Sequence, residues 1–294
     1  MKCQDLIRLL SRQFPESLAC SWDNVGLLAG NAEQEIHTIY IALDATDGVI
    51  EAAANAHADL LLTHHPLIFK GIKQVNSENF IGRRILELIR HDIAYYAMHT
   101  NFDVAAMADL AAERLELSEV AVLQETGMLP EMAVSFYAAG QTRASGNQEN
   151  CRSAAAKLCQ GGSGSIAVGI GKIGMLPGPM PLKDCAELTK KAFDLDKVKV
   201  FGDLDMQVHC AAVCPGSGKS VIEDALRKGA QVLITGDIDH HEGIDAVARG
   251  MAVIDAGHYG LEQIFIPYMK QYLEAQLPEL TVIAQAPQPP FLYL

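Results

Sequence analysis

The segment TDGVIEAAANAHADLLLTHH (46–65) occurs a second time as GKSVIEDALRKGAQVLITGD (218–237). The two copies align without a gap at an offset of 172 residues, and seven of the twenty positions are identical. Each copy begins with helix-forming residues and ends in a short apolar run that is typical of a buried strand. Two unrelated strand–helix–strand units of similar Ala-rich composition are the alternative. The ungapped match favours duplication of one α/β unit.

Apolar strands alternate with amphipathic helices on both sides of each copy. Strands are expected at 36–44, 59–65, 93–98 and 208–214, and helices at 46–58, 80–92 and 105–117. The Gly- and Pro-rich segments 160–165 and 171–182 are expected to form loops. This pattern predicts an α/β fold of two similar lobes, 1–127 and 128–294, each a mainly parallel or mixed sheet flanked by helices. The C-terminal segment is free to return to the first lobe.

The overall composition excludes several classes of protein. The chain has 23 Lys and Arg against 36 Asp and Glu, for a net charge of −13, which disfavours nucleic acid as a partner. Its apolar runs are shorter than the ~18 residues of a membrane span. The first residues place Leu6, Leu10 and Phe14 at helical spacing, unlike a signal peptide. Seven scattered cysteines without a C-x-x-C pair predict reduced thiols and a cytoplasmic protein.

Polar side chains gather where the predicted strands end, which is where parallel α/β sheets place their sites. His64 and His65 follow an apolar strand. Residues four apart share one face of a helix, so the pairs His99/Asp103 and His258/Glu262 can each present an imidazole and a carboxylate together. Separate, solvated surface histidines are the alternative.

These residues form a donor set without a thiolate, which suits Zn, Mn, Fe, Ni or Co. Two carboxylates also permit bridging between two ions. His99 and Asp237 are candidates for proton transfer or for support of a ligand. Asp237 occupies the repeat position of His65, although the run 237–242 also reads as a helix start with Asp239 as N-cap. His240 and His241 of this run have no assigned role.

The segment PGSGKS (215–220) resembles part of a phosphate-binding loop. The full pattern requires a glycine where this chain has Val213. The repeat places the segment at the turn between a strand and a helix, so an ordinary turn is the preferred interpretation.

Six motifs, in order, resemble a known family: DNVGLLAG (23–30), THHPLIF (63–69), HTNFD (99–103), GKIGMLPGPM (171–180), TGDIDHH (235–241) and DAGHYGLE (255–262). They are similar to the interacting-factor-three-like family, whose bacterial members are called GTP cyclohydrolase 1 type 2 homologues. The resemblance implies a toroidal homohexamer and a di-metal site in a cleft between two α/β lobes. It also implies that the metal ligands are His64, His65, Asp103, His258 and Glu262, with the glutamate shared by both ions.

The residues and the resemblance together predict a metal-dependent hydrolase acting on a small nucleotide-like or cyclic substrate, with two divalent ions per subunit. The alternatives are a non-catalytic metal carrier, a regulator that senses a metal or a ligand, and a scaffold with an incidental site. No guanine-reading group of residues stands out in the sequence. The apolar, Pro-rich end APQPPFLYL (286–294) is expected to be an extended arm that packs on its own core or on a neighbouring subunit.

Overall fold

Both copies of the repeat form strand–helix–strand units in the computed structural model, which describes residues 1–130 and 165–292. The first copy comprises β2 (Thr38–Ala42), α2 (Asp47–Asn55) and β3 (Leu60–Thr63). The second comprises β8 (Gln207–Ser217), η3 (Gly218–Val221), α9 (Ile222–Arg227) and β9 (Val232–Gly236). Both strand pairs are parallel.

The register of the two strand pairs confirms the predicted duplication. In the first copy Ile39 lies opposite Leu60, and in the second Ala211 lies opposite Val232. Each residue of the second pair follows its counterpart by the same 172 positions that separate the sequence repeats. A shift of one residue would turn every side chain to the other face, so a shared register implies a shared core pattern.

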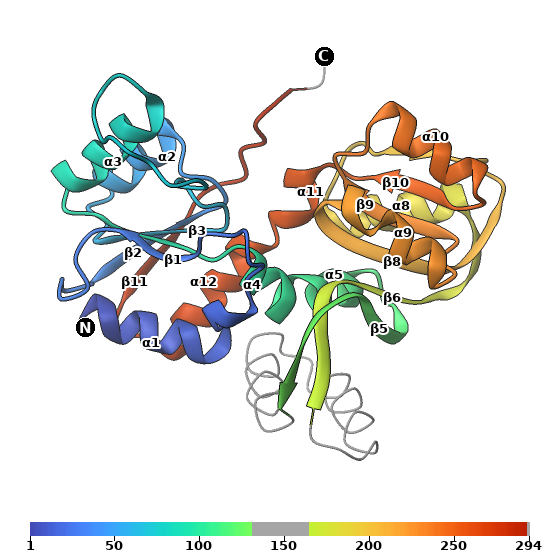
Figure 1. The fold of residues 1–294 in the computed structure, drawn as a ribbon, viewed down its shortest axis with the longest axis horizontal. Coiled ribbons are helices and arrows are strands. Elements are labelled where there is room, and N and C mark those ends of the chain that lie inside the picture. Colours follow the sequence, from blue (N-terminus) through green and yellow to red (C-terminus); the bar gives the residue numbers. More distant parts are fainter. Residues whose placement is uncertain (131–164, 293–294) are drawn as a thin grey trace. The chain divides into compact units, whose positions relative to one another are not determined.

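Two compact units contain these copies (Figure 1). The first consists mainly of Met1–Ala105 and Phe265–Gln288, and the second of Ala106–Met128 and Ala167–Ile264. The last helix and the last strand therefore belong to the first unit, although they follow the second unit in sequence.

The first unit contains a five-stranded sheet in the order β1-β4-β3-β2-β11, antiparallel only at β1. Its other strands are β1 (Gly26–Ala29), β4 (Ala94–Ala97) and β11 (Thr281–Ala284). Helices α2 and α3 cover one face, and α1 and α12 cover the other (Figure 1). The helices not yet given are α1 (Cys3–Gln13), η1 (Glu16–Leu18), α3 (Phe80–Arg90), α4 (Thr100–Phe102), the wide π-type turn η2 (Asp103–Met107) and α12 (Phe265–Gln276).

The second unit contains a six-stranded sheet in the order β5-β6-β8-β9-β10-β7. Strands β8, β9 and β10 are parallel, and the pairs β6/β8 and β10/β7 are antiparallel. The remaining strands are β5 (Ser118–Pro130), β6 (Ser165–Pro181), β7 (Lys199–Phe201) and β10 (Ala252–Asp255). The remaining helices are α5 (Ala108–Arg114), α8 (Leu182–Phe193), α10 (His240–Ala248) and α11 (His258–Glu262).

The prediction of a loop at 171–182 is wrong, because residues 165–181 form the strand β6. The glycines of this segment serve close packing between strands. A Cβ at Gly174 would lie 2.7 Å from the carbonyl oxygen of Ser118 on β5, so only glycine lets the two backbones approach. The Pro-rich part falls where the pairing with β8 is irregular, between Met175 and Met180. Residues 160–164 of the other expected loop lie outside the described residues.

The cysteines in the described residues act as small packing residues or surface thiols. Cys3, Cys20, Cys185 and Cys210 are free, and the Cys214 thiol donates to the carbonyl of Pro215 at 3.7 Å. Burial raises the pKa of Cys3 to about 11 and that of Cys185 to about 12, which makes both thiols unreactive. Cys151 and Cys159 lie outside the described residues. Within residues 1–130 and 165–292, no helix has the length and hydropathy needed to cross a membrane.

A cluster of aromatic rings joins α1 and α12 within the first unit. The ring of Phe14 lies 5.2 Å from Phe102, 5.3 Å from Tyr272 and 6.3 Å from Tyr268, measured between centroids. Phe14 is fully buried. Its ring therefore connects the beginning of the chain to the helix that returns from the other end.

We expect Phe14→Ala to lower the free energy of unfolding by ~3–5 kcal/mol, because it leaves a cavity among these rings. Urea denaturation measures the change. Ile89→Ala is the matched control, since Ile89 is 57% exposed on α3 and its truncation should cost less than ~0.5 kcal/mol. Equal effects of the two substitutions would contradict this description of the core.

Candidate metal centre

The end of β3 presents two histidines on a backbone that is held firmly in place. The Thr63 hydroxyl donates a hydrogen bond to the carbonyl of His65 at 2.8 Å, and the Tyr95 hydroxyl donates to the same carbonyl at 2.9 Å. The backbone N–H of Leu67 donates to the Tyr95 oxygen at 2.8 Å. Tyr95 thus fixes the turn that follows the histidines from a neighbouring strand.

Both imidazoles in this turn are oriented through Nδ1. Nδ1 of His64 lies 2.8 Å from the carbonyl oxygen of Met98, and Nδ1 of His65 lies 2.8 Å from Oδ1 of Asp44. A carbonyl and a carboxylate only accept hydrogen bonds, so each ring carries its hydrogen on Nδ1. Nε2 is then the nitrogen whose lone pair can bind a cation, as in carboxylate–histidine–metal triads.

A third histidine, His99, is held in the same way by Asp23. Nδ1 of His99 lies 2.8 Å from Oδ1 of Asp23, whose other oxygen accepts from the backbone N–H of Thr100 at 2.9 Å and from its hydroxyl at 2.5 Å. Burial by itself would raise the pKa of Asp23, but hydrogen bonds from His99 and Thr100 outweigh burial and lower that pKa to about 2. Asp23 is therefore an ionised anchor at neutral pH.

The first unit thus brings three imidazoles to one place. His64, His65 and His99 each offer a ring nitrogen within 4.8 Å of the other two. Oδ1 of Asp103 lies 3.4 Å from Nε2 of His64. The sequence predicts that His99 and Asp103 present their side chains together. In the structure Asp103 approaches His64 instead, and His99 bonds Asp23.

The second unit carries an imidazole and a carboxylate on α11. Nε2 of His258 lies 2.9 Å from Oε2 of Glu262, as the four-residue spacing predicts. Glu262 is only 2% exposed. Nδ1 of His258 lies 2.7 Å from Oδ2 of Asp237, whose φ of 57° places it in the left-handed region. Asp is one of the few residues that tolerate this conformation, which directs the carboxylate to His258.

A glycine makes room for the buried glutamate. Gly216 is the repeat counterpart of Asp44, and a Cβ at this position would collide with the Glu262 carboxylate. Its φ of 77° also favours glycine. The two copies have therefore diverged at equivalent positions. The first copy places an aspartate there, and the second leaves the space that Glu262 fills.

The run 237–242 both supports a histidine of the candidate site and begins a helix. Asp237 supports His258, and Asp239 caps α10 in a capping box with Glu242. Lys219 of the PGSGKS segment makes ion pairs with the carboxylates of Glu242 and Asp239. A lysine held by two carboxylates is not the phosphate ligand that a nucleotide-binding loop needs.

Asp23, Asp44 and Tyr95 hold the histidines of the first unit in place, and the sequence analysis does not predict these contacts. Asp44 ends the predicted strand 36–44, so the strand-end argument could have found it. Asp23 was noted only as part of the DNVGLLAG motif. Tyr95 lies inside a strand, where nothing in the sequence distinguishes it from a core residue.

The residues of each group fit divalent cations. In both groups an imidazole nitrogen with a lone pair faces a carboxylate oxygen, at 3.4 Å in the first and 2.9 Å in the second. Two electron-rich atoms at such distances repel each other unless a proton or a cation lies between them. Imidazole and carboxylate donors without thiolate are the ligands of Zn, Mn, Fe, Ni and Co.

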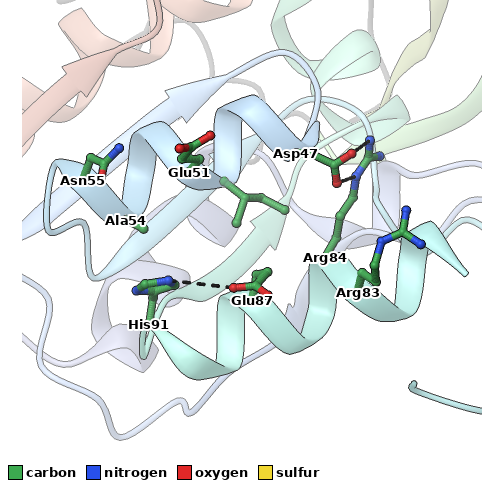
Figure 2. Close-up of a pocket in the computed structure, with 9 residues that line it drawn as sticks. Asp47, Glu51, Ala54, Asn55, Arg83, Arg84, Glu87 and His91 are labelled. Carbon is green, nitrogen blue, oxygen red and sulfur yellow. Dashed lines mark hydrogen bonds and ion pairs between the residues drawn. The ribbon is translucent and has the colours of Figure 1, made fainter. Parts of the chain in front are cut away.

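A separate pocket of about 500 Å³ lies between α2 and α3, and its lining includes none of these histidines (Figure 2). Figure 2 shows Arg84 paired with Asp47, at 2.8 Å, and His91 near Glu87, at 3.9 Å. The pair Asp47–Arg84 joins α2 to α3, whereas Glu87 and His91 both belong to the α3 side of the pocket. We assign the pocket no part in the chemistry of the histidine groups.

The low pKa of Asp23 gives a test of its anchoring role. A pKa lowered from 3.8 to about 2 stabilises the folded protein by about 2 kcal/mol above pH 4, and this contribution is lost as the pH falls through about 2. We expect Asp23→Asn to cost about 2 kcal/mol at neutral pH and about half as much near pH 3. Urea unfolding at both pH values measures this. The exposed Asp205→Asn is the control, and a cost of Asp23→Asn that does not vary with pH would contradict the assignment.

The chain is similar to named bacterial proteins over most of its length. A Bacillus subtilis (strain 168) protein named GTP cyclohydrolase 1 type 2 homolog is 30% identical over 327 aligned positions, which cover 87% of this chain and 88% of the relative. A protein of the same name from Clostridium acetobutylicum is 28% identical over 284 positions, with coverage of 96% and 93%. The first alignment is longer than the 294 residues of this chain, so the Bacillus relative carries residues that this chain lacks.

The fold also matches solved structures. The crystal structure of a Bacillus cereus protein related to NIF3 superposes with a TM-score of 0.82 at 26% identity, covering all of this chain and 99% of the other. The profile of the Duf34/NIF3 (NGG1p interacting factor 3) family matches residues 1–289. These matches confirm the resemblance that the six motifs indicate, and the chain belongs to the Duf34/NIF3 family.

Proposed function

We propose that this protein is a di-metal hydrolase acting on a small nucleotide-like or cyclic substrate. The proposed ligands of two divalent ions are His64, His65, Asp103, His258 and Glu262. The observation that carries the proposal is that all three of these histidines are anchored through Nδ1, which leaves the lone pair of Nε2 available for a cation. Relatives named GTP cyclohydrolase 1 type 2 homolog support the substrate class by analogy.

The proposal requires the two groups of residues to meet at one centre. Two bound ions would lower the pKa of a water and polarise the group under attack. Glu262 would be shared by both ions, and its carboxylate would offset part of their positive charge. Asp44 and Asp237 would hold two of the imidazoles in their binding orientation.

His99 is the proposed proton-transfer group. Its Nδ1 bonds to Asp23, which is ionised at neutral pH. Nε2 can therefore take up a proton from water, and the Asp23 carboxylate stabilises the imidazolium that forms. His99 would thus act as the general base, and the Asp23 carboxylate would orient its imidazole.

We further propose that the protein works in the cytoplasm as a homohexamer. The free cysteines of the described residues fit a reducing compartment. The hexamer follows from the family resemblance. Exposed Phe291 and Leu292, in a segment outside helices and strands, fit an arm that a neighbouring subunit would cover.

Glu262→Gln tests the metal centre. An amide keeps the shape of the side chain but lacks its charge and bridges two cations poorly. We expect the variant to lose at least one metal ion per subunit while its thermal unfolding stays cooperative. Elemental analysis of protein purified without chelators or nickel resin gives the metal content.

His37→Ala is the control, because the His37 side chain is exposed and distant in sequence from every proposed ligand. Full metal content in Glu262→Gln would refute the ligand assignment. Turnover of cyclic and nucleotide substrates by the metal-loaded wild type separates the enzyme from a metal carrier or sensor. A metal-loaded protein that turns over none of them would favour the carrier.

A further inference from the structure

Two large aromatic side chains are exposed beside the first group of histidines. Trp22 is 57% exposed and Phe69 is 44% exposed, and their ring centroids lie 5.7 Å apart. Apolar rings in water are unfavourable, and exposed apolar patches often mark binding sites. These two rings lie next to the candidate chemistry, since each also contacts the imidazole of His99.

The two aromatic residues stand on segments of fixed backbone. Asp23, next to Trp22, is anchored by His99 and Thr100. The Asn24 amide donates to the carbonyl oxygen of Ile68 at 2.5 Å, which ties the segment of Trp22 to that of Phe69. The rings are therefore exposed on an ordered surface, which lowers the entropy that a ligand would have to remove on binding.

The rings of Trp22, Phe69 and His99 contact one another and form a corner. The planes of Trp22 and Phe69 are only 36° apart. His99 stands edge-on to both, at 73° to Trp22 and 67° to Phe69, with centroids 5.9 Å and 6.0 Å away. A flat ring that stacks on Trp22 or Phe69 would therefore lie near the His99 imidazole.

The charge beside the corner favours an anionic ligand. Lys70 directly follows Phe69, and Lys73 is close in sequence. Both are exposed, and the next acidic residue is Glu78. The carboxylate of Asp23, next to Trp22, is buried and bonded to His99 and Thr100, so the exposed charges that follow Phe69 in sequence are these two lysines.

We propose that Trp22, Phe69 and His99 form the ring-recognition surface of this protein, which stacks a planar heteroaromatic ring that bears an anionic group. The inference rests on the proposed function and specifies how its substrate is selected. Stacking on exposed aromatic rings tolerates different bases because every base has a π-face. The surface would therefore select for ring shape and charge, while the metal ligands would act on the ring edge near His99.

Trp22 is the sole tryptophan of the chain, so fluorescence excited at wavelengths beyond the absorption of the eight tyrosines reports on this surface. The probes are adenosine and guanosine 5′-monophosphate, with ribose 5-phosphate as the ring-free comparison and free tryptophan amide as the correction for absorbance. We expect saturable quenching by both nucleotides and none by ribose 5-phosphate. We expect Phe69→Leu to weaken nucleotide binding by about tenfold.

Phe80→Leu is the matched control. Phe80 is 52% exposed in the same unit but packs against the guanidinium of Arg84, 5.1 Å from its ring centroid. Its substitution should leave nucleotide binding unchanged. Equal weakening by Phe80→Leu and Phe69→Leu would overturn the proposal.

Two further outcomes would overturn it. One is the absence of quenching by either nucleotide in protein with full metal content, which would leave the proposed metal centre intact. The other is Trp22 emission that is shielded from acrylamide and depends on protein concentration, because a second copy of the chain would then cover the rings. The two proposals can also fail in the opposite way. If the Glu262→Gln variant retains all its metal and still stacks nucleotides, the proposed metal centre is refuted and the ring-recognition surface is supported.

Discussion

The hydrogen bond from histidine Nδ1 to a fixed acceptor is the interaction on which the proposed chemistry depends. It occurs at four histidines, in the pairs His64–Met98, His65–Asp44, His99–Asp23 and His258–Asp237. In each case the bond determines which nitrogen carries the hydrogen and where the other one points. Three acceptors are carboxylates, which also offset the positive charge of whatever the imidazoles bind. A surface histidine of the ordinary kind has no need of such support.

The duplicated α/β unit supplies the positions for these bonds. In both copies a helix-linked pair of parallel strands has the same register, so His65 and Asp237 stand at equivalent positions just after the second strand. Their roles are complementary, since His65 is a candidate ligand and Asp237 orients the candidate ligand His258. Gly216 and Asp44 differ for a related reason, because the second copy needs space for Glu262. Divergence of this kind lets one architecture provide two unlike groups of side chains.

The sequence predicted the strands, the repeat and the strand-end histidines well, because these depend on local periodicity and on a match between aligned segments. It failed at 171–182, where pairing with β8 and close contact with β5 overrode the loop-forming tendency of glycine and proline. It also missed Asp23 and Asp44. Their roles depend on contacts across 76 and 21 residues, and no local pattern encodes such contacts. The exposure of Trp22 is likewise a property of the folded surface, since a lone tryptophan in a sequence ordinarily indicates core.

The proposed metal centre binds divalent ions through Nε2 of His64, His65 and His258 and through the carboxylates of Asp103 and Glu262. Its sharpest test is anomalous diffraction from crystals of protein purified without chelators or nickel resin, measured at the absorption edges of the candidate metals. We expect two neighbouring peaks, each ~2.0–2.3 Å from its ligand atoms, with Glu262 contacting both. Peaks at the exposed His240–His241 pair alone, or metal bound through Nδ1 of the anchored histidines, would contradict it.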